Sequence, residues 1–255
     1  MAGDSKDDKG EWWQSFFTGL VLDVVRRVRP DEVTQAETSF IQRTLNVPPG
    51  ANILDVPCGS GRHAIKMALR GYRVTGVDIA LPLLETAMRD AEEHRLEVTW
   101  EHRDMRDLPW KEAFDGAYCF WGSFGYFDEQ GNADFLRAVA NALKPGAKFV
   151  IDTPIAETEL PPFQERSWAQ FGDVYALEER HYDHAQARVD REWTLLRGGE
   201  MEKRSLSMRL YTYRELCLLL QAAGFVGCRG YGSLNHEPFR LGLNRFYMVA
   251  VKQQG

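Results

Sequence analysis

Cysteine is scarce in this chain of 255 residues, which contains four of them: Cys58, Cys119, Cys217 and Cys228. No pair stands in C-x-x-C spacing, and no three of them cluster along the sequence. Zinc sites and iron–sulfur clusters are usually built from such groups. The sequence therefore predicts no metal centre.

The chain also lacks a surplus of positive charge, because its formal net charge is −6 and its pI is about 5.6. Proteins that bind nucleic acids usually carry a basic face. The sequence has no long apolar run of membrane-spanning length and no signal peptide. We therefore expect a cytoplasmic protein with no nucleic-acid or membrane partner, and a flexible charged tail over residues 1–10.

Hydrophobic residues, by contrast, make up 44% of the chain, enough for the core of one α/β domain with an insertion. Strands are predicted over residues 52–56, 73–77, 97–103, 114–120 and 147–152. Helices are predicted over residues 61–70 and 132–143, with another that opens at Pro82. This alternation predicts a doubly wound parallel sheet, which binds ligands at the carboxyl ends of its strands.

Two segments fall outside this alternation. Residues 11–29 carry apolar side chains at helical spacing up to Pro30, and a second helix is predicted over residues 33–45. Later in the chain, three strands with mixed polar and apolar positions are predicted over residues 175–182, 188–197 and 203–211. We interpret them as an antiparallel meander inserted at the ligand-binding edge. A helix over residues 213–223 and strands over residues 225–231 and 245–251 complete the main domain.

The segment from Asn52 to Ala64 has the pattern of a buried strand that enters a glycine turn and opens a helix. Gly59 and Gly61 leave the turn without side chains, so backbone N–H groups at the helix start can approach a ligand. The spacing Gly59-x-Gly61-x-x-Ala64 also fits the dinucleotide motif of nicotinamide and flavin enzymes. The turn alone therefore predicts a nucleotide-like ligand without identifying it.

Three carboxylates follow predicted strands and narrow the choice of ligand. Asp55 precedes the turn, where an amino-acid-bearing ligand offers an ammonium group. Asp78 ends the next strand, about 20 residues on, and is placed to accept hydrogen bonds from ribose hydroxyls. Asp104 ends a third strand beside the apolar Met105, a pair suited to an adenine ring and its amino group. Together they favour a methionyl-adenosine ligand over a dinucleotide.

In the order and spacing of this turn and these acids, residues 10–252 resemble the class I S-adenosylmethionine-dependent methyltransferases of small-molecule type. The resemblance implies a Rossmann-like, seven-stranded, mostly parallel sheet with an antiparallel last strand. It also implies S-adenosyl-L-methionine as the methyl donor. The cofactor would be held by Asp55, Pro57, Cys58, Gly59, Ser60, Gly61, Asp78, Ile79, Asp104, Met105, Phe120 and Trp121. Pro57 departs from the family motif, which usually has glycine at that position.

By the same resemblance the chain divides into four parts. These are a tail over residues 1–10, an N-terminal helical lid over 11–47, a cofactor-binding domain over 48–152 and 212–255, and an inserted antiparallel β cap over 153–211. An N-terminal helix often closes over the cofactor in this family. Trp13 and Phe17 are therefore candidate lid contacts.

Catalysis and acceptor binding have fewer markers in the sequence. Methyl transfer is an in-line displacement, for which alignment in a dry site suffices unless the acceptor must lose a proton. The candidate catalytic residues are Tyr126, which follows the fourth strand, and His236, on the loop after the strand 225–231. Arg240 on the same loop joins them as a candidate substrate contact.

The acceptor class follows mainly from a missing motif. Enzymes that methylate planar amino groups carry an Asn/Asp-Pro-Pro-aromatic motif after the fourth strand, where this chain has Cys119-Phe120-Trp121-Gly122. With the acidic pI and the predicted cap, this absence favours the N or O atom of a small-molecule metabolite. Two alternatives stay open: a nicotinamide-dependent oxidoreductase that uses the same glycine turn, and a noncatalytic module that binds S-adenosylmethionine.

Overall fold

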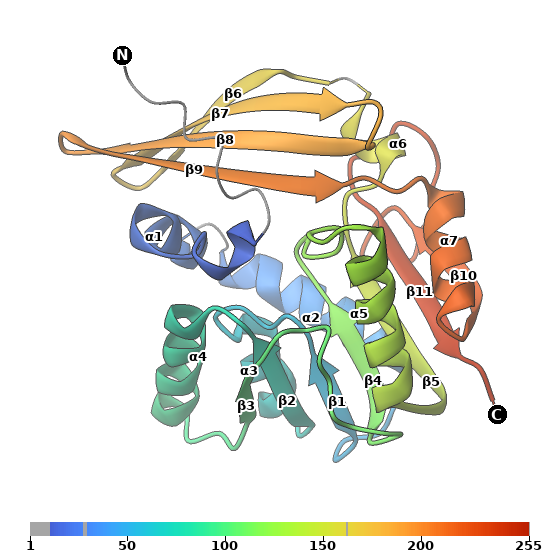
Figure 1. The fold of residues 1–255 in the computed structure, drawn as a ribbon. Coiled ribbons are helices and arrows are strands. Elements are labelled where there is room, and N and C mark those ends of the chain that lie inside the picture. The colour runs from blue at the N-terminus through green and yellow to red at the C-terminus, as the bar shows by residue number, and fades with distance from the viewer. Residues whose placement is uncertain (1–10, 28–29, 162, 255) are drawn as a thin grey trace.

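The computed structural model of the protein describes residues 11–27, 30–161 and 163–254. The tail predicted over residues 1–10 lies outside the described residues. A seven-stranded sheet flanked by helices forms the body, and a separate four-stranded sheet lies across its upper end (Figure 1). None of the helices in these three ranges combines the length and apolar character needed to cross a bilayer.

The larger sheet has the strand order β10-β11-β5-β4-β1-β2-β3. Its strands are β1 (Asn52–Asp55), β2 (Arg73–Asp78), β3 (Thr99–His102), β4 (Phe114–Cys119), β5 (Leu143–Asp152), β10 (Phe225–Tyr231) and β11 (Tyr247–Lys252). Neighbours run parallel except at β11, which is antiparallel to both β5 and β10. The predicted fold class, a mostly parallel doubly wound sheet, is confirmed.

Helices pack against this sheet through two buried clusters. The helices are α2 (Asp31–Leu45), α3 (Arg62–Leu69), α4 (Leu81–Glu93), α5 (Glu129–Ala142) and α7 (Tyr213–Ala222). One cluster contains Phe40 of α2, and the other contains Phe135 of α5. The adjacent β1 residues Ile53 and Leu54 belong to different clusters. Because successive residues of a strand point to opposite faces, both faces of the sheet are buried.

The insertion forms a four-stranded antiparallel sheet, which we call the cap sheet. Its strands are β6 (Arg166–Phe171), β7 (Val174–Asp183), β8 (Arg188–Arg197) and β9 (Glu200–Arg209), paired in chain order after the short helix α6 (Ala156–Glu159). The sequence predicted the last three strands and missed β6. That strand pairs only with β7 at the edge of the sheet and is mostly exposed, so it lacks the apolar alternation that marks a buried strand.

The N-terminal region differs from the single helix predicted over residues 11–29. A 3₁₀ turn, η1 (Trp12–Gln14), is followed by a break and then by α1 (Gly19–Arg27). At the break, Gly19 has φ +55°, and Leu20 N donates to Glu202 Oε2 of β9 at 2.8 Å. The Glu202 carboxylate therefore accepts a hydrogen bond from a backbone N–H at the start of α1, which has no partner within the helix. This tertiary contact explains why residues 11–27 do not form one continuous helix. Figure 1 shows α1 directly below the cap sheet.

Candidate functional site

A cavity of about 300 Å³ lies between the carboxyl ends of the parallel strands, the N-terminal segment (residues 11–18) and the cap sheet. Its floor comes from the glycine turn and from the loops that follow β2 and β3. Its walls come from the loop after β4, which we call the β4 loop (residues 120–127), from the N-terminal segment and from β8 and β9. Ligands of doubly wound sheets bind at this edge.

The two glycines of the turn have different surroundings. Gly59 has φ +54° and Gly61 has φ +73°, both in the left-handed region that favours glycine. A Cβ at Gly61 would lie 2.5 Å from the Trp100 ring, whereas a Cβ at Gly59 would meet no atom within 4 Å. Gly61 therefore makes room for Trp100 beneath the turn, and Gly59 leaves the cavity floor open to a ligand.

Asp78, the last residue of β2, reaches the cavity and supports the turn. Its Oδ2 accepts a hydrogen bond from Gly59 N at 2.7 Å, and its Oδ1 accepts one from Ala80 N at 2.8 Å. Burial raises the pKa of this carboxyl, although the two backbone N–H groups act in the opposite direction. The strand end thus brings a carboxylate to the edge of the open space above Gly59.

Asp104 and Met105 line the cavity after β3. Arg106 donates to Asp104 from Nη2 at 2.6 Å and from its backbone N at 2.8 Å. Burial alone would raise the pKa of Asp104, but these contacts lower it overall. The Arg106 guanidinium also lies 4.1 Å from the Phe127 ring centroid, so this corner of the cavity is tied to the β4 loop.

Asp55 does not line the cavity. It ends β1 with 1% of its surface exposed. Burial raises the pKa of this carboxyl well above the usual value. Gly61 is likewise absent from the cavity lining, whereas Pro57, Cys58 and Ser60 belong to it. The Val56–Pro57 peptide bond is cis.

Glu37 of α2 organises the basic side chains at the start of α3, a role that sequence reasoning missed. Its Oε2 accepts from Arg62 Nη1 at 2.6 Å and lies 2.9 Å from His63 Nε2. Burial would raise the pKa of Glu37, but the His63 hydrogen bond and the Arg62 charge lower it to about 2. Arg62 and His63 both line the cavity, so Glu37 fixes them from behind.

Aromatic side chains form much of the cavity wall. Trp13 and Phe17 of the N-terminal segment and Tyr126 of the β4 loop all line the cavity, as do Phe120, Trp121 and Ile79. The Trp12 ring centroid lies 4.5 Å from that of Tyr126, and the Trp13 centroid 4.7 Å from that of Phe127. The N-terminal segment and the β4 loop therefore form one continuous aromatic surface.

The cap sheet contributes four lining residues that the sequence did not single out: Arg191, Trp193, Leu206 and Met208. Arg191 and Leu206 are directly paired across β8 and β9 and so point to the same face. Because residues two apart in a strand point to the same face, the sequence could have predicted that Arg191 and Trp193 lie on one face of β8. The facing partners depend on the strand register, which the sequence did not specify.

Glutamates compensate the positive charge of Arg191. Arg191 Nη1 lies 3.1 Å from Glu178 Oε1, and Arg191 also forms an ion pair with Glu159. Trp193 Nε1 donates to the same Glu178 oxygen at 3.0 Å. The wall of the cavity formed by β8 therefore presents an aromatic ring and a neutralised guanidinium.

His236 and Arg240 lie away from the cavity lining. His236 Nε2 forms a hydrogen bond with the Thr44 hydroxyl at 2.8 Å, and its ring packs 4.7 Å from Phe40 of α2. Burial lowers the pKa of His236. Arg240 is exposed on the same loop. Within the described ranges, no group of three His, Cys, Asp or Glu side chains is placed to hold a metal ion.

Comparison with known proteins finds similarity to methyltransferases over part of the chain. Residues 53–146 match the family model described as "Methyltransferase domain". The O-methyltransferase resE of Aspergillus sclerotiorum is 30% identical over 148 residues, which are 56% of this chain and 54% of that protein. The ubiquinone biosynthesis O-methyltransferase of Xanthomonas axonopodis pv. citri is 33% identical over 108 residues, 42% of this chain and 44% of that protein. The chain thus spans about half the length of the curated relatives it matches.

Solved structures share the whole fold. The CcbJ methyltransferase from Streptomyces caelestis has a TM-score of 0.80 at 16% identity, with 97% of this chain and 100% of that chain covered. The sugar N-methyltransferase KedS8 from Streptoalloteichus sp. ATCC 53650 has a TM-score of 0.71 at 22% identity, with 100% and 99% covered. The likeness therefore includes the cap sheet as well as the body.

Proposed function

We propose that this protein, whose residues 53–146 match the methyltransferase-domain model, transfers a methyl group from S-adenosyl-L-methionine to a nitrogen or oxygen atom of a small molecule. One observation carries the proposal: the open turn at Gly59 and the carboxylates of Asp78 and Asp104 surround a single cavity. A nicotinamide dinucleotide would share the turn and the ribose acid. Binding of a dinucleotide would not, however, explain the Asp104–Met105 pair that follows the third strand.

The residues of the cavity floor fit S-adenosylmethionine. Gly59 and Ser60 would offer a backbone cradle, Asp78 would accept hydrogen bonds from the ribose hydroxyls, and Asp104 with Met105 would hold the adenine. The bound cofactor supplies a methyl group on a positively charged sulfur. Phe120 and Trp121 also line the cavity, and their aromatic faces would stabilise such a cation by roughly 0.5–2 kcal/mol.

We assign the acceptor to the aromatic half of the cavity, formed by the N-terminal segment, Tyr126 and the lining residues of β8 and β9. These side chains exclude water and align the acceptor, which is the main requirement of an in-line displacement. Burial raises the pKa of Tyr126, so its phenol keeps its proton near neutrality. Tyr126 therefore serves as a hydrogen-bond donor and not as a general base.

We further propose the division of the chain that this activity requires. Residues 48–152 and 212–255 hold the cofactor, residues 11–47 act as a lid, and residues 153–211 act as a cap over the acceptor. The net charge of −6 supports a small-molecule substrate and not a nucleic acid, and we expect the enzyme to work in the cytoplasm.

Calorimetric titration with S-adenosylhomocysteine tests the cofactor site. We expect Asp78→Asn and Asp78→Ala to weaken its binding about 10- to 100-fold, because each loses hydrogen bonds to a charged acceptor. Asp134→Asn is the matched control, since Asp134 pairs with Arg137 on α5 outside the cavity. Normal affinity in the Asp78 variants would contradict the site, and tight NADH binding without S-adenosylhomocysteine binding would overturn the function.

A panel of phenols and amino sugars tests the reaction itself. We expect S-adenosylhomocysteine to form from S-adenosylmethionine with at least one member of the panel. Cofactor binding without turnover across the panel would favour a noncatalytic binding module.

A further inference from the structure

Arg188, the first residue of β8, joins the cap sheet to the β4 loop. Its guanidinium donates from Nη1 to Phe127 O at 2.8 Å and from Nη2 to Tyr126 O at 3.1 Å. The same side chain donates from Nε to the Ser207 hydroxyl and from Nη2 to Ser207 O, both at 2.8 Å. One side chain therefore holds the carbonyls of two cavity-lining residues against the edge strand β9.

The N-terminal segment reaches the same point. Trp12 Nε1 donates at 3.2 Å to Ser207 O, the carbonyl that also accepts from Arg188. The Trp12 ring packs against the Tyr126 ring, whose own carbonyl is bonded to Arg188. Three parts of the cavity wall that are far apart in the sequence thus meet around Ser207.

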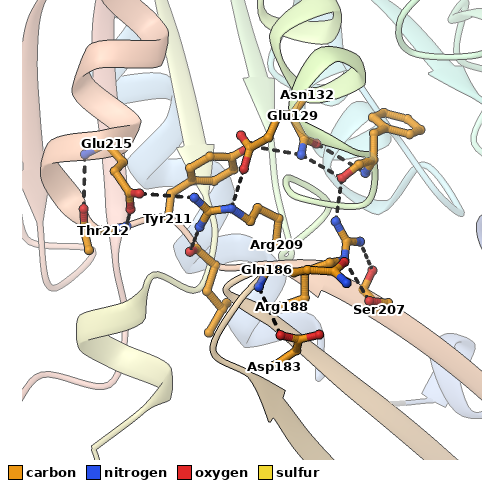
Figure 2. Close-up of polar contacts among 12 residues, drawn as sticks. Glu129, Asn132, Asp183, Gln186, Arg188, Ser207, Arg209, Tyr211, Thr212 and Glu215 are labelled. Carbon is orange, nitrogen blue, oxygen red and sulfur yellow. Dashed lines mark hydrogen bonds and ion pairs between the residues drawn. The ribbon is translucent and has the colours of Figure 1, made fainter.

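The body of the protein holds the other side of the loop. Asn132 of α5 is buried; its Nδ2 donates to Phe127 O at 2.9 Å and its Oδ1 accepts from Phe127 N at 3.3 Å. Figure 2 shows Arg188 and Asn132 approaching the end of the β4 loop from the cap sheet and from α5. Losing Arg188 therefore removes the side-chain anchor of the loop on the cap side, while Asn132 and the backbone bond from Arg209 N to Gly125 O at 2.8 Å remain.

Arg209 provides an internal comparison. It lies directly opposite Arg188 in the β8–β9 pair, but its side chain has different partners. It donates to Glu129 of α5 at 2.6 Å and to Glu215 of α7 at 3.1 Å, and lies 4.3 Å from the Tyr211 ring centroid. These partners lie outside the cavity lining, so Arg209 fastens the cap to the helices, as Figure 2 also shows.

We propose that Arg188 is a positioning residue for the acceptor half of the cavity, holding the cap sheet, the β4 loop and the N-terminal segment in one fixed arrangement. Arg188 does not line the cavity itself and acts through the backbone of Tyr126 and through Ser207. The assignment of this half to the acceptor rests on the proposed function, whereas the three-way connection rests on the hydrogen bonds alone.

The test compares Arg188→Met with Arg209→Met, which remove matched cations from paired positions. Hydrogen exchange is measured on the full chain with saturating S-adenosylhomocysteine. We expect Arg188→Met to speed exchange at least tenfold in peptides covering both residues 11–18 and 120–127. Arg209→Met should leave residues 11–18 unchanged while lowering the unfolding temperature by a similar amount. Arg188→Lys should restore part of the protection, since an ammonium can still bond a carbonyl.

Kinetics give the readout that a purely structural role would not change. With the panel acceptor that the wild type methylates fastest, Arg188→Met should raise the acceptor KM about tenfold and lower kcat. The KM for S-adenosylmethionine should stay within threefold. Arg209→Met should keep all three constants within twofold of the wild type.

Equal exchange at residues 11–18 in the two methionine variants would overturn the proposal, as would equal acceptor KM values. If the wild type fails to bind S-adenosylhomocysteine, the proposed function fails. The exchange comparison, repeated without the ligand, then still decides whether Arg188 connects the three parts.

Discussion

Gly59 and Gly61 lie two residues apart in one turn, yet a side chain is disfavoured at each position for a different reason. Gly61 avoids the ring of Trp100, whereas Gly59 faces open space. We expect Gly61→Ala to lower the free energy of unfolding by about 2–5 kcal/mol, because the alanine would have a positive φ and would also clash with Trp100. Gly59→Ala should cost about 1–2 kcal/mol for its positive φ and in addition reduce S-adenosylhomocysteine affinity at least tenfold.

Urea denaturation and calorimetric titration of both variants measure the two effects separately. If Gly59→Ala bound S-adenosylhomocysteine as tightly as the wild type, the ligand would not cross the turn at this residue.

Glu37 predicts a pH dependence of stability. Its pKa in the folded protein is about 2, below the usual value of 4.5, so folding favours the charged form. The stabilisation is therefore complete above about pH 4.5 and is lost as the pH falls towards 2. Glu37→Gln should be less stable than the wild type by about 3 kcal/mol near pH 7, with the gap shrinking below pH 4.5.

Urea denaturation of both proteins between pH 7 and pH 3 measures this gap. A gap that did not change with pH would show that Glu37 stabilises the fold by packing and not by its charge.

For single residues, the sequence correctly predicted two cavity-lining carboxylates that come at or just after the end of a parallel strand. Asp78 and Asp104 lie in the cavity because parallel strands finish at one edge. Glu37 could not be found this way, since it lies inside a helix and meets Arg62 and His63 only through the packing of α2 on α3. His236 was predicted from its loop, but that loop turns back onto Phe40.

The cap sheet has two faces with different roles. Trp193 of β8 lines the cavity, whereas Trp168 of β6 is 71% exposed. We expect Trp193→Ala to raise the acceptor KM about tenfold by removing its aromatic contact area. The variant should bind S-adenosylhomocysteine within twofold of the wild type.

Trp168→Ala is the control on the same sheet and should leave both values unchanged, with stability within about 0.5 kcal/mol. Steady-state kinetics with the best panel acceptor check the pair. Equal effects of the two substitutions would contradict the placement of the acceptor beneath β8.

Elements were predictable where burial imposes a pattern. The central strands and α2 emerge from apolar runs and helical spacing, because both faces of the sheet are covered. Strand β6 and the break before α1 were not, because each depends on a partner distant in sequence. Strand β6 needs β7 beside it, and α1 starts where Glu202 accepts a hydrogen bond from Leu20 N.

The body, the N-terminal segment and the cap sheet all line the cavity, so a ligand there contacts all three parts of the molecule. S-adenosylhomocysteine at 100 times its Kd should stabilise the fold by about 2.7 kcal/mol. For a chain of this size that raises the unfolding temperature by about 5–10 °C. Differential scanning calorimetry measures the shift, with NADH at equal concentration as the control. A larger shift with NADH would favour the oxidoreductase.

The overall architecture was predictable because alternating strands and helices admit few arrangements. The position of the cap sheet over the N-terminal segment was not, since it depends on contacts such as that of Trp12 with Ser207. The Trp12–Ser207 contact connects residues almost 200 positions apart, and a local sequence pattern cannot predict a contact over that distance.

Strand β11 has a consequence for the order in which the protein folds. It pairs with β5, for example Met248 with Ile151, and it separates β5 from β10 in the sheet. The cap sheet and α7 lie between these partners in the chain, so the sheet stays in two pieces until a long loop has closed. Such distant pairing slows folding. During synthesis, the unpaired edge of β5 is open to other strands until β11 has emerged and covered it.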